Sequence, residues 1–370
     1  MLDLGIERIE VYRVSLAYAE PFRIALGTSV KSENIIVKVQ TDFGVEGWGE
    51  ASPSFKITNE TPETVVDALT KMGPELIGMC PFKVEQIIEK MDEIVNGNTS
   101  AKAAIDMAIF DVIGKKTRKP VSALLGGYRD EVLTDITIGI KSPEEMAKSA
   151  VKYIKKGFKI LKVKVGVNPS EDVERIRRVR EAVGSEIKIR IDANQGWTPK
   201  EAVEVINKIE KYDVELIEQP VKAEDLKGLA TVRKNSSIPI MADESVHSPE
   251  DALKVIRAEA ADVINIKLMK SGGIWKAMKI AAIAEAAKIP CMVGCMGESN
   301  LGITAAVHFA AAVKNVQYAD LDADLLLKDK LVKRGGAKIR DSKRIPPKKK
   351  GLGITAFNEK LLGKPVKVFK

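Results

Sequence analysis

The stretch ILKVKVG, residues 160–166, is a short apolar run with lysines at its third and fifth positions. The chain then repeats this layout, an apolar run that carries an ionisable residue at or near its C-terminal end. The later runs are IKIRIDAN (187–194), VELIEQP (214–220), IPIMADES (238–245) and VINIKLMK (263–270). The ionisable residues are, in order, Lys164, Asp192, Glu218, Asp243 and Lys267. Such runs are typical of parallel strands that are buried on both faces.

Charged amphipathic segments separate these runs, and similar runs at 134–140, 291–296 and 316–321 extend the series. The expected helices span 143–156, 169–183, 199–211, 224–234, 249–258, 273–288 and 301–313. Strands that alternate with helices predict a parallel sheet with crossover helices. Eight strands and seven helices fit a (β/α)7β modified TIM barrel, whose active site lies at the strand C-termini. An open doubly wound sheet is the alternative, but no G-x-G-x-x-G motif follows the first strand.

Residues 1–130 follow a different pattern and predict an α+β capping domain. Alternating residues indicate antiparallel strands, and Asp42–Gly44 supplies a turn between two of them. The expected elements are strands at 7–19, 35–40 and 45–50 and helices at 62–77, 84–96 and 101–114. We place the barrel domain at 131–325. Residues from about 326 to 370 lack the barrel repeat, and we expect them to complete the capping domain.

The net charge of +8 comes from 59 Lys and Arg against 51 Asp and Glu. These residues are interleaved along the chain, which predicts a solvated lysine-rich surface and no nucleic-acid partner. No apolar run approaches the ~20 residues of a membrane span. The acidic N-terminus, with Asp3 and Glu7, does not resemble a signal peptide. We expect a cytoplasmic homo-oligomer that binds a small molecule and no membrane.

Lys162 and Lys164 are predicted to point into the barrel near its mouth. Side chains alternate along a strand, so these two lysines share a face while Leu161, Val163 and Val165 point towards the helices. A buried pair of ammonium groups without a function is costly because both lose their solvation. The alternative is that one lysine reaches the rim and pairs with a surface acid.

Asp192, Glu218 and Asp243 are predicted to lie on three adjacent strands, and neighbouring strands are ~5 Å apart. Three carboxylates this close repel one another unless a cation lies among them. Oxygen ligands suit a hard ion such as Mg²⁺. Neither histidine, His247 nor His308, falls on these strands, which argues against zinc. For any single acid, a helix cap or a salt bridge is the alternative role.

Lys267 ends the sixth predicted strand, and Lys164 ends the second. In an eight-stranded barrel, these strands face each other across the axis, so the two lysines flank whatever binds at the centre. Two bases on opposite faces of one carbon can remove a proton from one face and return it to the other. This arrangement predicts racemisation or epimerisation, in which the metal holds the adjacent carboxylate and stabilises an enediolate.

Asp320 and Asp322 follow the eighth strand and lie two residues apart, hence on one face. That strand lies opposite the centre of the predicted metal cluster. A substrate with its carboxylate at the metal presents its far end to these aspartates, which suit an ammonium group. An extended dipeptide, roughly 7 Å long at ~3.5 Å per residue, matches the span. A turn or capping role for both aspartates is the alternative.

The sequence motifs together resemble the enolase superfamily, muconate-lactonizing subgroup. They are K-V-K (162–164), D-A-N (192–194), E-Q-P (218–220), A-D-E-S (242–245), N-I-K-L-M-K-S-G-G (265–273) and, in the capping region, W-G-E-A (48–51). The D-L-D at 320–322 resembles the dipeptide epimerases of this subgroup, which include the L-Ala-D/L-Glu epimerases.

The resemblance implies an isomerase that inverts the α-carbon of the C-terminal residue of an L,L-dipeptide by two-base proton transfer. It implies Mg²⁺ at Asp192, Glu218 and Asp243, with Lys164 and Lys267 as the acid/base catalysts. It implies that Asp320 and Asp322 bind the α-ammonium group. The other implied residues are Thr137, Lys162, Cys295 and Gly297 as substrate contacts and Asn194 and Glu298 as supports.

The second side chain of the dipeptide stays open. The loop at 18–31 carries Gly27 where members that act on L-Ala-L-Glu carry an arginine. Arg23 is a candidate substitute for that cation, and a hydrophobic or mixed dipeptide is an equal alternative. We expect the loop at 52–59 to line the same pocket.

Two other functions stay open. The same site could perform an o-succinylbenzoate synthase-like or muconate cycloisomerase-like reaction. Asp320 and Asp322 discriminate against both, since their substrates have no ammonium group. The chain could also be a non-catalytic basic binding protein.

Overall fold

A computed structural model describes residues 5–370. Within this range, eight parallel strands form one sheet whose order, β5 to β12, follows the chain. The backbone N–H of Asp135, just before β5, donates to the carbonyl of Ala319 at the end of β12 (3.3 Å), which joins the two outer strands. The predicted (β/α)7β barrel is therefore confirmed. The doubly wound alternative is wrong, because its strand order would reverse partway.

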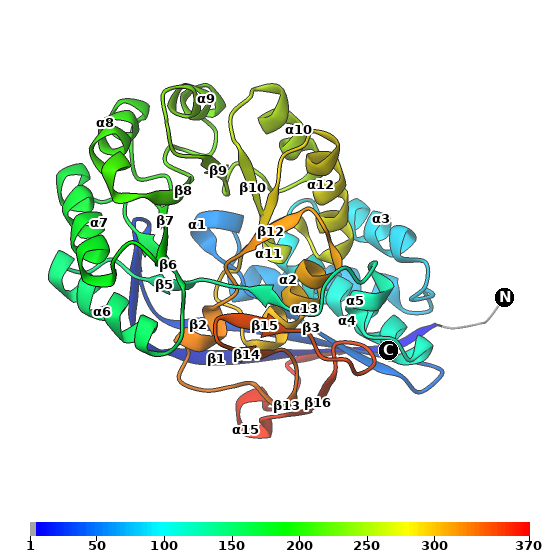
Figure 1. Ribbon diagram of the computed structural model, residues 1–370. Helices are drawn as coiled ribbons and strands as arrows, with labels where there is room; N and C mark the ends of the chain where they lie inside the picture. The colour runs from blue at the N-terminus through cyan, green and yellow to red at the C-terminus, as the bar shows by residue number, and fades with distance from the viewer. Residues whose placement is uncertain (1–4) are drawn as a thin grey trace.

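The predicted barrel elements are all present, with ends shifted by a few residues. The strands span Ile136–Ile138 (β5), Ile160–Lys164 (β6), Lys188–Asp192 (β7), Val214–Glu218 (β8), Ile240–Ala242 (β9), Val263–Ile266 (β10), Cys291–Val293 (β11) and Val316–Ala319 (β12). The helices span Pro143–Lys155 (α6), Pro169–Val183 (α7), Pro199–Ile209 (α8), Leu226–Lys234 (α9), Pro249–Arg257 (α10), Ile274–Ala286 (α12) and Asn300–Ala312 (α13). Figure 1 shows helices α6–α10 and α12 on the outside of the strands.

One predicted strand ends early. The run at 263–270 continues as a strand only to Ile266, and Leu268–Ser271 (α11) forms a helical turn with Lys267 at its N-cap. Gly272 follows in a left-handed conformation (φ 82°), which turns the chain towards α12. Two further short helices lie in this half of the chain, Glu210–Tyr212 (η1) and Ala323–Leu326 (α14).

An antiparallel sheet in the order β17-β1-β2-β3 lies beside the barrel (Figure 1). Its strands span Ile6–Ile24 (β1), Gly27–Thr41 (β2), Glu46–Ala51 (β3) and Lys367–Phe369 (β17). Ile9 of β1 pairs with Phe369 of β17, so the C-terminal segment returns to the first block of the chain. The hairpin of β1 and β2 is longer than the predicted strands. The prediction fell short because the outer half of the hairpin is polar and exposed and lacks an alternating pattern.

The remaining elements complete the capping region. Its helices span Phe55–Thr58 (α1), Pro62–Leu76 (α2), Val84–Ile94 (α3), Thr99–Thr117 (α4) and Val121–Leu124 (α5). Two small sheets contain Val132–Leu133 (β4), Val332–Gly335 (β13), Lys338–Arg340 (β14), Lys343–Ile345 (β15) and Ile354–Phe357 (β16), and Glu359–Leu362 (α15) lies near the C-terminus.

Helix α4 joins the two parts of the molecule. Most of its residues are buried, and β3 crosses it so closely that a Cβ at Gly49 would lie 1.9 Å from the carbonyl oxygen of Ala104. Asp106 of α4 accepts the backbone N–H groups of Ile274 (2.5 Å) and Trp275 (3.2 Å) at the start of α12. Helix α12 has no side-chain cap of its own, so Asp106 supplies the missing acceptor. The domain boundaries at 130 and 325 stay predictions.

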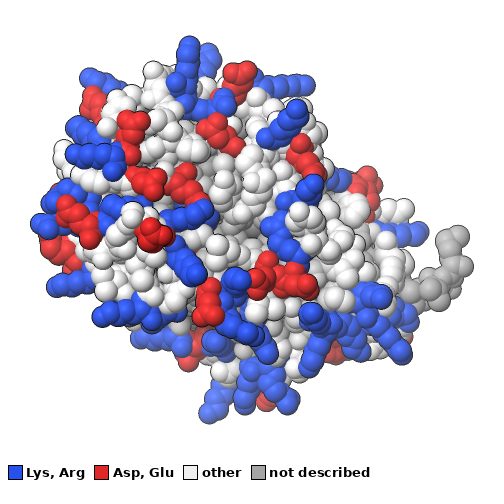
Figure 2. Space-filling model, in the orientation of Figure 1, with Lys and Arg blue, Asp and Glu red and all other residues white. Residues whose placement is uncertain are grey.

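The charged surface agrees with the sequence pattern. Figure 2 shows Lys and Arg spread over one face with Asp and Glu among them, and mostly uncharged residues in the middle. No helix within residues 5–370 has both the length and the apolar composition needed to cross a bilayer.

Candidate active site

Strand β6 directs two lysines into the barrel. Lys162 and Lys164 are buried, and Leu161 and Val163 fill the opposite face with no exposure. The strand register places Lys164 beside Asp192 on β7. It also places Asp192 beside Glu218 on β8, so these residues form a lateral row at the C-terminal ends of neighbouring strands.

The predicted acid/base lysines contact opposite ends of the acidic trio Asp192, Glu218 and Asp243. Lys164 Nζ lies 2.6 Å from Asp192 Oδ2, and Lys267 Nζ lies 2.6 Å from Asp243 Oδ2. Strands β7, β8 and β9 separate β6 from β10, so the two lysines come from well-separated strands of the ring. The structure thus brings together five of the predicted site residues.

The trio fits a bound divalent cation. Its three carboxylates are almost completely buried, at 0–1% exposure. Neither Glu218 Oε2 nor Asp243 Oδ1 accepts a hydrogen bond from the described residues, although Lys162 Nζ and Lys270 Nζ lie 2.7 and 2.6 Å away. Burial and the charge of Asp192 raise the pKa of Glu218 to about 8. Three buried carboxylates gathered at one place offer the oxygen ligands that suit Mg²⁺.

Three residues that the sequence reasoning missed lie around this trio. Asn265 of β10 lies two residues before Lys267. Its Nδ2 donates to Glu218 Oε1 (2.8 Å). Lys270 Nζ donates to the backbone carbonyl oxygens of Asp243 and Asn265. The sequence did not reveal this role of Lys270, because the apolar residues of its turn resemble a strand. Glu244 is the third, and burial raises its pKa to about 7.

Asn194, predicted to support the site, makes three hydrogen bonds there. Its side-chain oxygen accepts from Lys164 Nζ (3.0 Å), and its Nδ2 donates to Glu244 Oε1 (3.1 Å). Its backbone N–H donates to Asp192 Oδ1 (2.8 Å). Asn194 therefore connects a predicted base to a predicted metal ligand and to Glu244.

Asp320 and Asp322 form a second buried acidic group. Lys162 Nζ lies 2.7 Å from Asp320 Oδ2, a pairing that sequence reasoning did not anticipate. The backbone N–H of Thr137 donates to Asp322 Oδ2 (2.6 Å), and Cys295 Sγ lies 3.7 Å from Asp322 Oδ1. Burial and the charge of Asp320 raise the pKa of Asp322 to about 7.

Cys295, Asp320 and Asp322 lie close enough together to suggest a second metal site. Burial raises the pKa of the Cys295 thiol well above its ordinary value, so the thiol keeps its proton and is a poor ligand. Asp320 already has a cationic partner in Lys162. This group is better suited to a ligand that carries a positive charge and hydrogen-bond donors.

Gly297 lies where the capping region meets the barrel. Its carbonyl accepts from Ser32 Oγ (2.7 Å) and Asn34 Nδ2 (2.9 Å) of β2. A Cβ at Gly297 would lie 2.5 Å from Ser32 Oγ, so the close approach requires glycine. The adjacent Glu298 accepts the backbone N–H of Met296, and burial raises its pKa to about 8.

A cavity of about 200 Å³ opens above the lysines, between barrel and cap. Its barrel wall contains Lys164, Asn194, Lys267, Cys295 and Gly297, and its cap wall includes Tyr18, Phe22, Ile24, Ser52 and Ile57. Part of the expected 52–59 loop lines it, whereas Phe55 of that loop is 69% exposed. Arg23 is exposed and is not among the lining residues.

The chain matches two family descriptions. Residues 145–360 match "Enolase C-terminal domain-like", and residues 8–126 match "Mandelate racemase / muconate lactonizing enzyme, N-terminal domain". A hydrophobic dipeptide epimerase of Enterococcus faecalis is 47% identical, over 86% of this chain and 91% of the relative. An L-Ala-D/L-Glu epimerase of Bacillus subtilis is 46% identical, over 95% of this chain and 97% of the relative.

A solved structure is also similar. It is a dipeptide epimerase from Enterococcus faecalis V583, complexed with Mg and the dipeptide L-Leu-L-Tyr. It superimposes with a TM-score of 0.93 at 45% identity, and the match covers 95% of this chain and all of the other.

Proposed function

The chain belongs to the mandelate racemase/muconate lactonizing enzyme family of the enolase superfamily, and from this premise we propose that it is a Mg²⁺-dependent dipeptide epimerase. It is an isomerase that acts on amino acid derivatives, like the epimerases it resembles. The observation that carries the proposal is the placement of Lys164 and Lys267 at opposite ends of a buried acidic trio.

Asp192, Glu218 and Asp243 would hold the Mg²⁺ ion. When bound, the ion supplies charge neutralisation for the trio and a Lewis acid for the substrate carboxylate, which acidifies the neighbouring α-carbon. Asn265 and Lys270 orient two of the ligands through the hydrogen bonds that they donate.

Lys164 and Lys267 perform the proton transfers. One ammonium must be deprotonated to accept the α-proton from one face of the carbon, while the other donates a proton to the opposite face. Both lysines line the cavity above the trio, where an α-carbon next to the bound carboxylate would lie. The cap residues Tyr18, Phe22 and Ile57 cover part of this cavity.

Asp320 and Asp322 hold the α-ammonium group of the N-terminal residue. Asp320 pairs with Lys162, whereas Asp322 forms no ion pair within the described residues, so the ammonium group supplies the positive charge that buried Asp322 lacks. Substrates of β-elimination or cycloisomerisation have no such group, so this pair favours a dipeptide.

A screen of L,L-dipeptides in D₂O with the Mg²⁺-loaded protein tests the function. Mass spectrometry and chiral analysis should detect deuterium and inversion at the α-carbon of the C-terminal residue. Deuterium at the N-terminal α-carbon, or no exchange with any dipeptide, would contradict the proposal.

A further inference from the structure

A second cavity, of about 160 Å³, lies between residues 18–22 of β1 and the C-terminal part of α6. Thr137 lines it, and the backbone N–H of Thr137 donates to Asp322. Tyr18 and Phe22 line both this cavity and the one above the catalytic lysines. The second cavity therefore begins where the ammonium group of a dipeptide would be held, next to the α-carbon that carries the first side chain.

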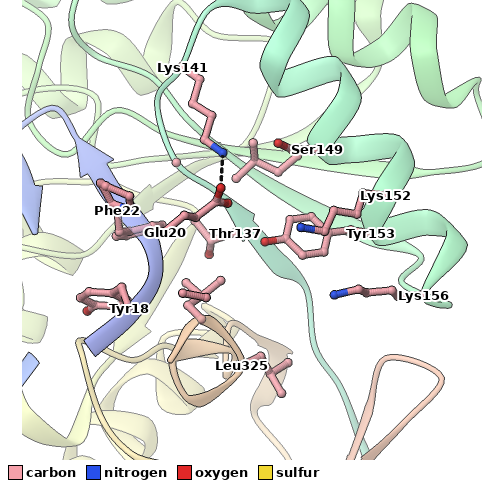
Figure 3. Close-up of a pocket in the computed structure, with 15 residues that line it drawn as sticks. Tyr18, Glu20, Phe22, Thr137, Lys141, Ser149, Lys152, Tyr153, Lys156 and Leu325 are labelled. Atoms are coloured by element: carbon pink, nitrogen blue, oxygen red, sulfur yellow. Dashed lines mark ion pairs between the residues drawn. The ribbon is translucent and has the colours of Figure 1, made fainter. Parts of the chain in front are cut away.

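The walls of this cavity carry more positive than negative charge. Lys141, Lys152 and Lys156 line it together with Glu20. Lys141 Nζ pairs with Glu20 (2.9 Å), whereas Lys152 and Lys156 form no ion pair with any acid in the described chain. Figure 3 shows both of their ammonium groups directed towards the middle of the cavity.

Helix α6 carries these groups, and Lys152 and Lys156 are both exposed. Lys152 and Tyr153 lie on its last turn and Lys156 is its C-cap. Lys156 Nζ lies 5.7 Å from the centre of the Tyr153 ring, within the range of a cation–π contact. Burial and the charges of Asp322 and Glu20 raise the pKa of Tyr153 to about 12, so its hydroxyl stays a hydrogen-bond donor.

The part of the cavity near Thr137 is apolar. Phe22 stacks on Tyr18 with ring centres 5.8 Å apart, and Ile138 and Leu325 complete this part of the wall. A side chain that enters from the ammonium site would pass these groups before it reaches the lysines. An aliphatic stem that ends in an anionic group matches this order.

We infer that this cavity receives the side chain of the N-terminal residue of the dipeptide and that Lys152 and Lys156 select an acidic side chain, glutamate above all. The inference rests on the proposed epimerase function and specifies its substrate class. A lysine or arginine side chain would bring a third unpaired cation to the same walls. Glutamine has the shape of glutamate without the charge, so it isolates the contribution of the two lysines.

Rates with L-Glu-L-Leu and L-Gln-L-Leu test the inference, since leucine suits Ile24 and Ile57 of the first cavity. Two partly exposed charge contacts predict a kcat/KM about 10-fold higher for the glutamyl substrate. The double variant Lys152→Met/Lys156→Met should reduce this ratio to about 1. Lys155→Met, an exposed lysine of α6 outside the cavity lining, is the matched control and should keep the wild-type ratio.

A binding measurement separates recognition from turnover. Dipeptides with C-terminal 2-aminoisobutyrate have no α-hydrogen, so L-Glu-Aib and L-Gln-Aib should bind to the Mg²⁺-loaded protein without reacting. Calorimetry should give tighter binding of L-Glu-Aib, a difference that shrinks with salt and disappears in the double variant.

The inference is overturned if the wild type does not prefer the glutamyl dipeptide to the glutaminyl one, or if this preference survives in the double variant. In either case, deuterium exchange of dipeptides would still uphold the proposed function. Absence of exchange with every dipeptide would overturn both.

Discussion

Glu218 depends on one amide for the orientation of its carboxylate. Asn265 Nδ2 donates to its Oε1, while its Oε2 accepts no hydrogen bond from residues 5–370. The amide therefore fixes one oxygen, while the other has only the ammonium group of Lys162 beside it (2.7 Å), an arrangement that suits a metal ligand with a supporting partner.

Asn265→Ala removes the donor to Glu218, and we expect the affinity for Mg²⁺ to fall by about 10- to 100-fold. Calorimetric titration with Mg²⁺ measures the change. Asn315→Ala is the control, because the side-chain amide of Asn315 donates to Ile289 (2.9 Å), Ala281 and Cys291 and to none of the trio. Unchanged Mg²⁺ affinity in the Asn265 variant would exclude a supporting role for this amide.

At this scale, the sequence predicted residues whose position follows from a strand end. Lys164, Asp192 and Glu218 form one row because each ends its strand, and alternation decides which face each occupies. The pairing of Lys162 with Asp320 was not predictable in this way. It depends on the closure of the barrel, which places β12 next to β5 and therefore only one strand away from β6.

Helix α4 and strand β3 illustrate how two elements fix the cap against the barrel. Gly49 allows β3 to contact the backbone of α4, and Asp106 connects the same helix to the start of α12. The contact is between backbone atoms, so a Cβ at position 49 could not avoid it by side-chain rotation.

Gly49→Ala should lower the free energy of unfolding by about 2–3 kcal/mol, since its Cβ would overlap the Ala104 carbonyl. Denaturant unfolding gives the value. Gly184→Ala provides the comparison, because Gly184 has a φ of 75° but no atom within 4 Å of its Cβ position. Gly49 has no positive φ, so any loss in its variant comes from close packing, and a Gly49→Ala variant as stable as the wild type would contradict this account.

His308 on α13 gives the fold a pH-dependent contact. Its side chain has no exposure, and its Nδ1 accepts the backbone N–H of Ser122 (3.1 Å), so the ring is neutral at that atom. Burial lowers its pKa to about 4. Protonation of Nδ1 would break this hydrogen bond.

The unfolded chain protonates this histidine near pH 6.5, before the folded protein does, so the stability due to His308 is complete above about pH 6.5 and declines as the pH falls towards 4. The loss is about 3 kcal/mol. His308→Gln, which keeps an acceptor, should reduce the decline between pH 7 and 4.5 in urea unfolding. An identical decline in wild type and variant would contradict the assignment.

The sequence predicted elements well where both faces of a strand or one face of a helix are buried. The β1–β2 hairpin and α11 were the exceptions. Residues 27–34 of β2 are polar and largely exposed, so backbone pairing with β1 holds them without an apolar pattern. The α11 turn is wholly buried, and its apolar residues read as a strand.

At the scale of the whole molecule, the site is made by two parts of the chain that the sequence describes separately. The cavity has a barrel wall and a cap wall, and Tyr18, Phe22 and Ser52 of the cap lie far in sequence from the lysines. Sequence patterns predict each part alone. The contacts between the parts, and therefore the shape of the substrate pocket, follow from docking that no local pattern encodes.

Bound Mg²⁺ should stabilise the whole fold, because the unfolded chain does not assemble the trio of carboxylates. At about 100 times the dissociation constant, the free energy of unfolding should rise by about 2.7 kcal/mol. Thermal unfolding with Mg²⁺ and with EDTA measures the difference, and Asp243→Asn should abolish most of the response. A response of full size in that variant would place the ion elsewhere.

The central claim is that Lys164 and Lys267 act from opposite faces of one carbon, and exchange into D₂O by the single variants tests it most directly. Lys164→Ala and Lys267→Ala should each lose epimerisation by about 10²- to 10⁴-fold, the usual contribution of a general acid or base. The remaining lysine can still remove and return a proton on its own face. Each variant should therefore incorporate deuterium without inversion into one diastereomer, L,L in one variant and L,D in the other. Exchange of the same diastereomer by both variants, or wild-type epimerisation by either, would contradict the claim.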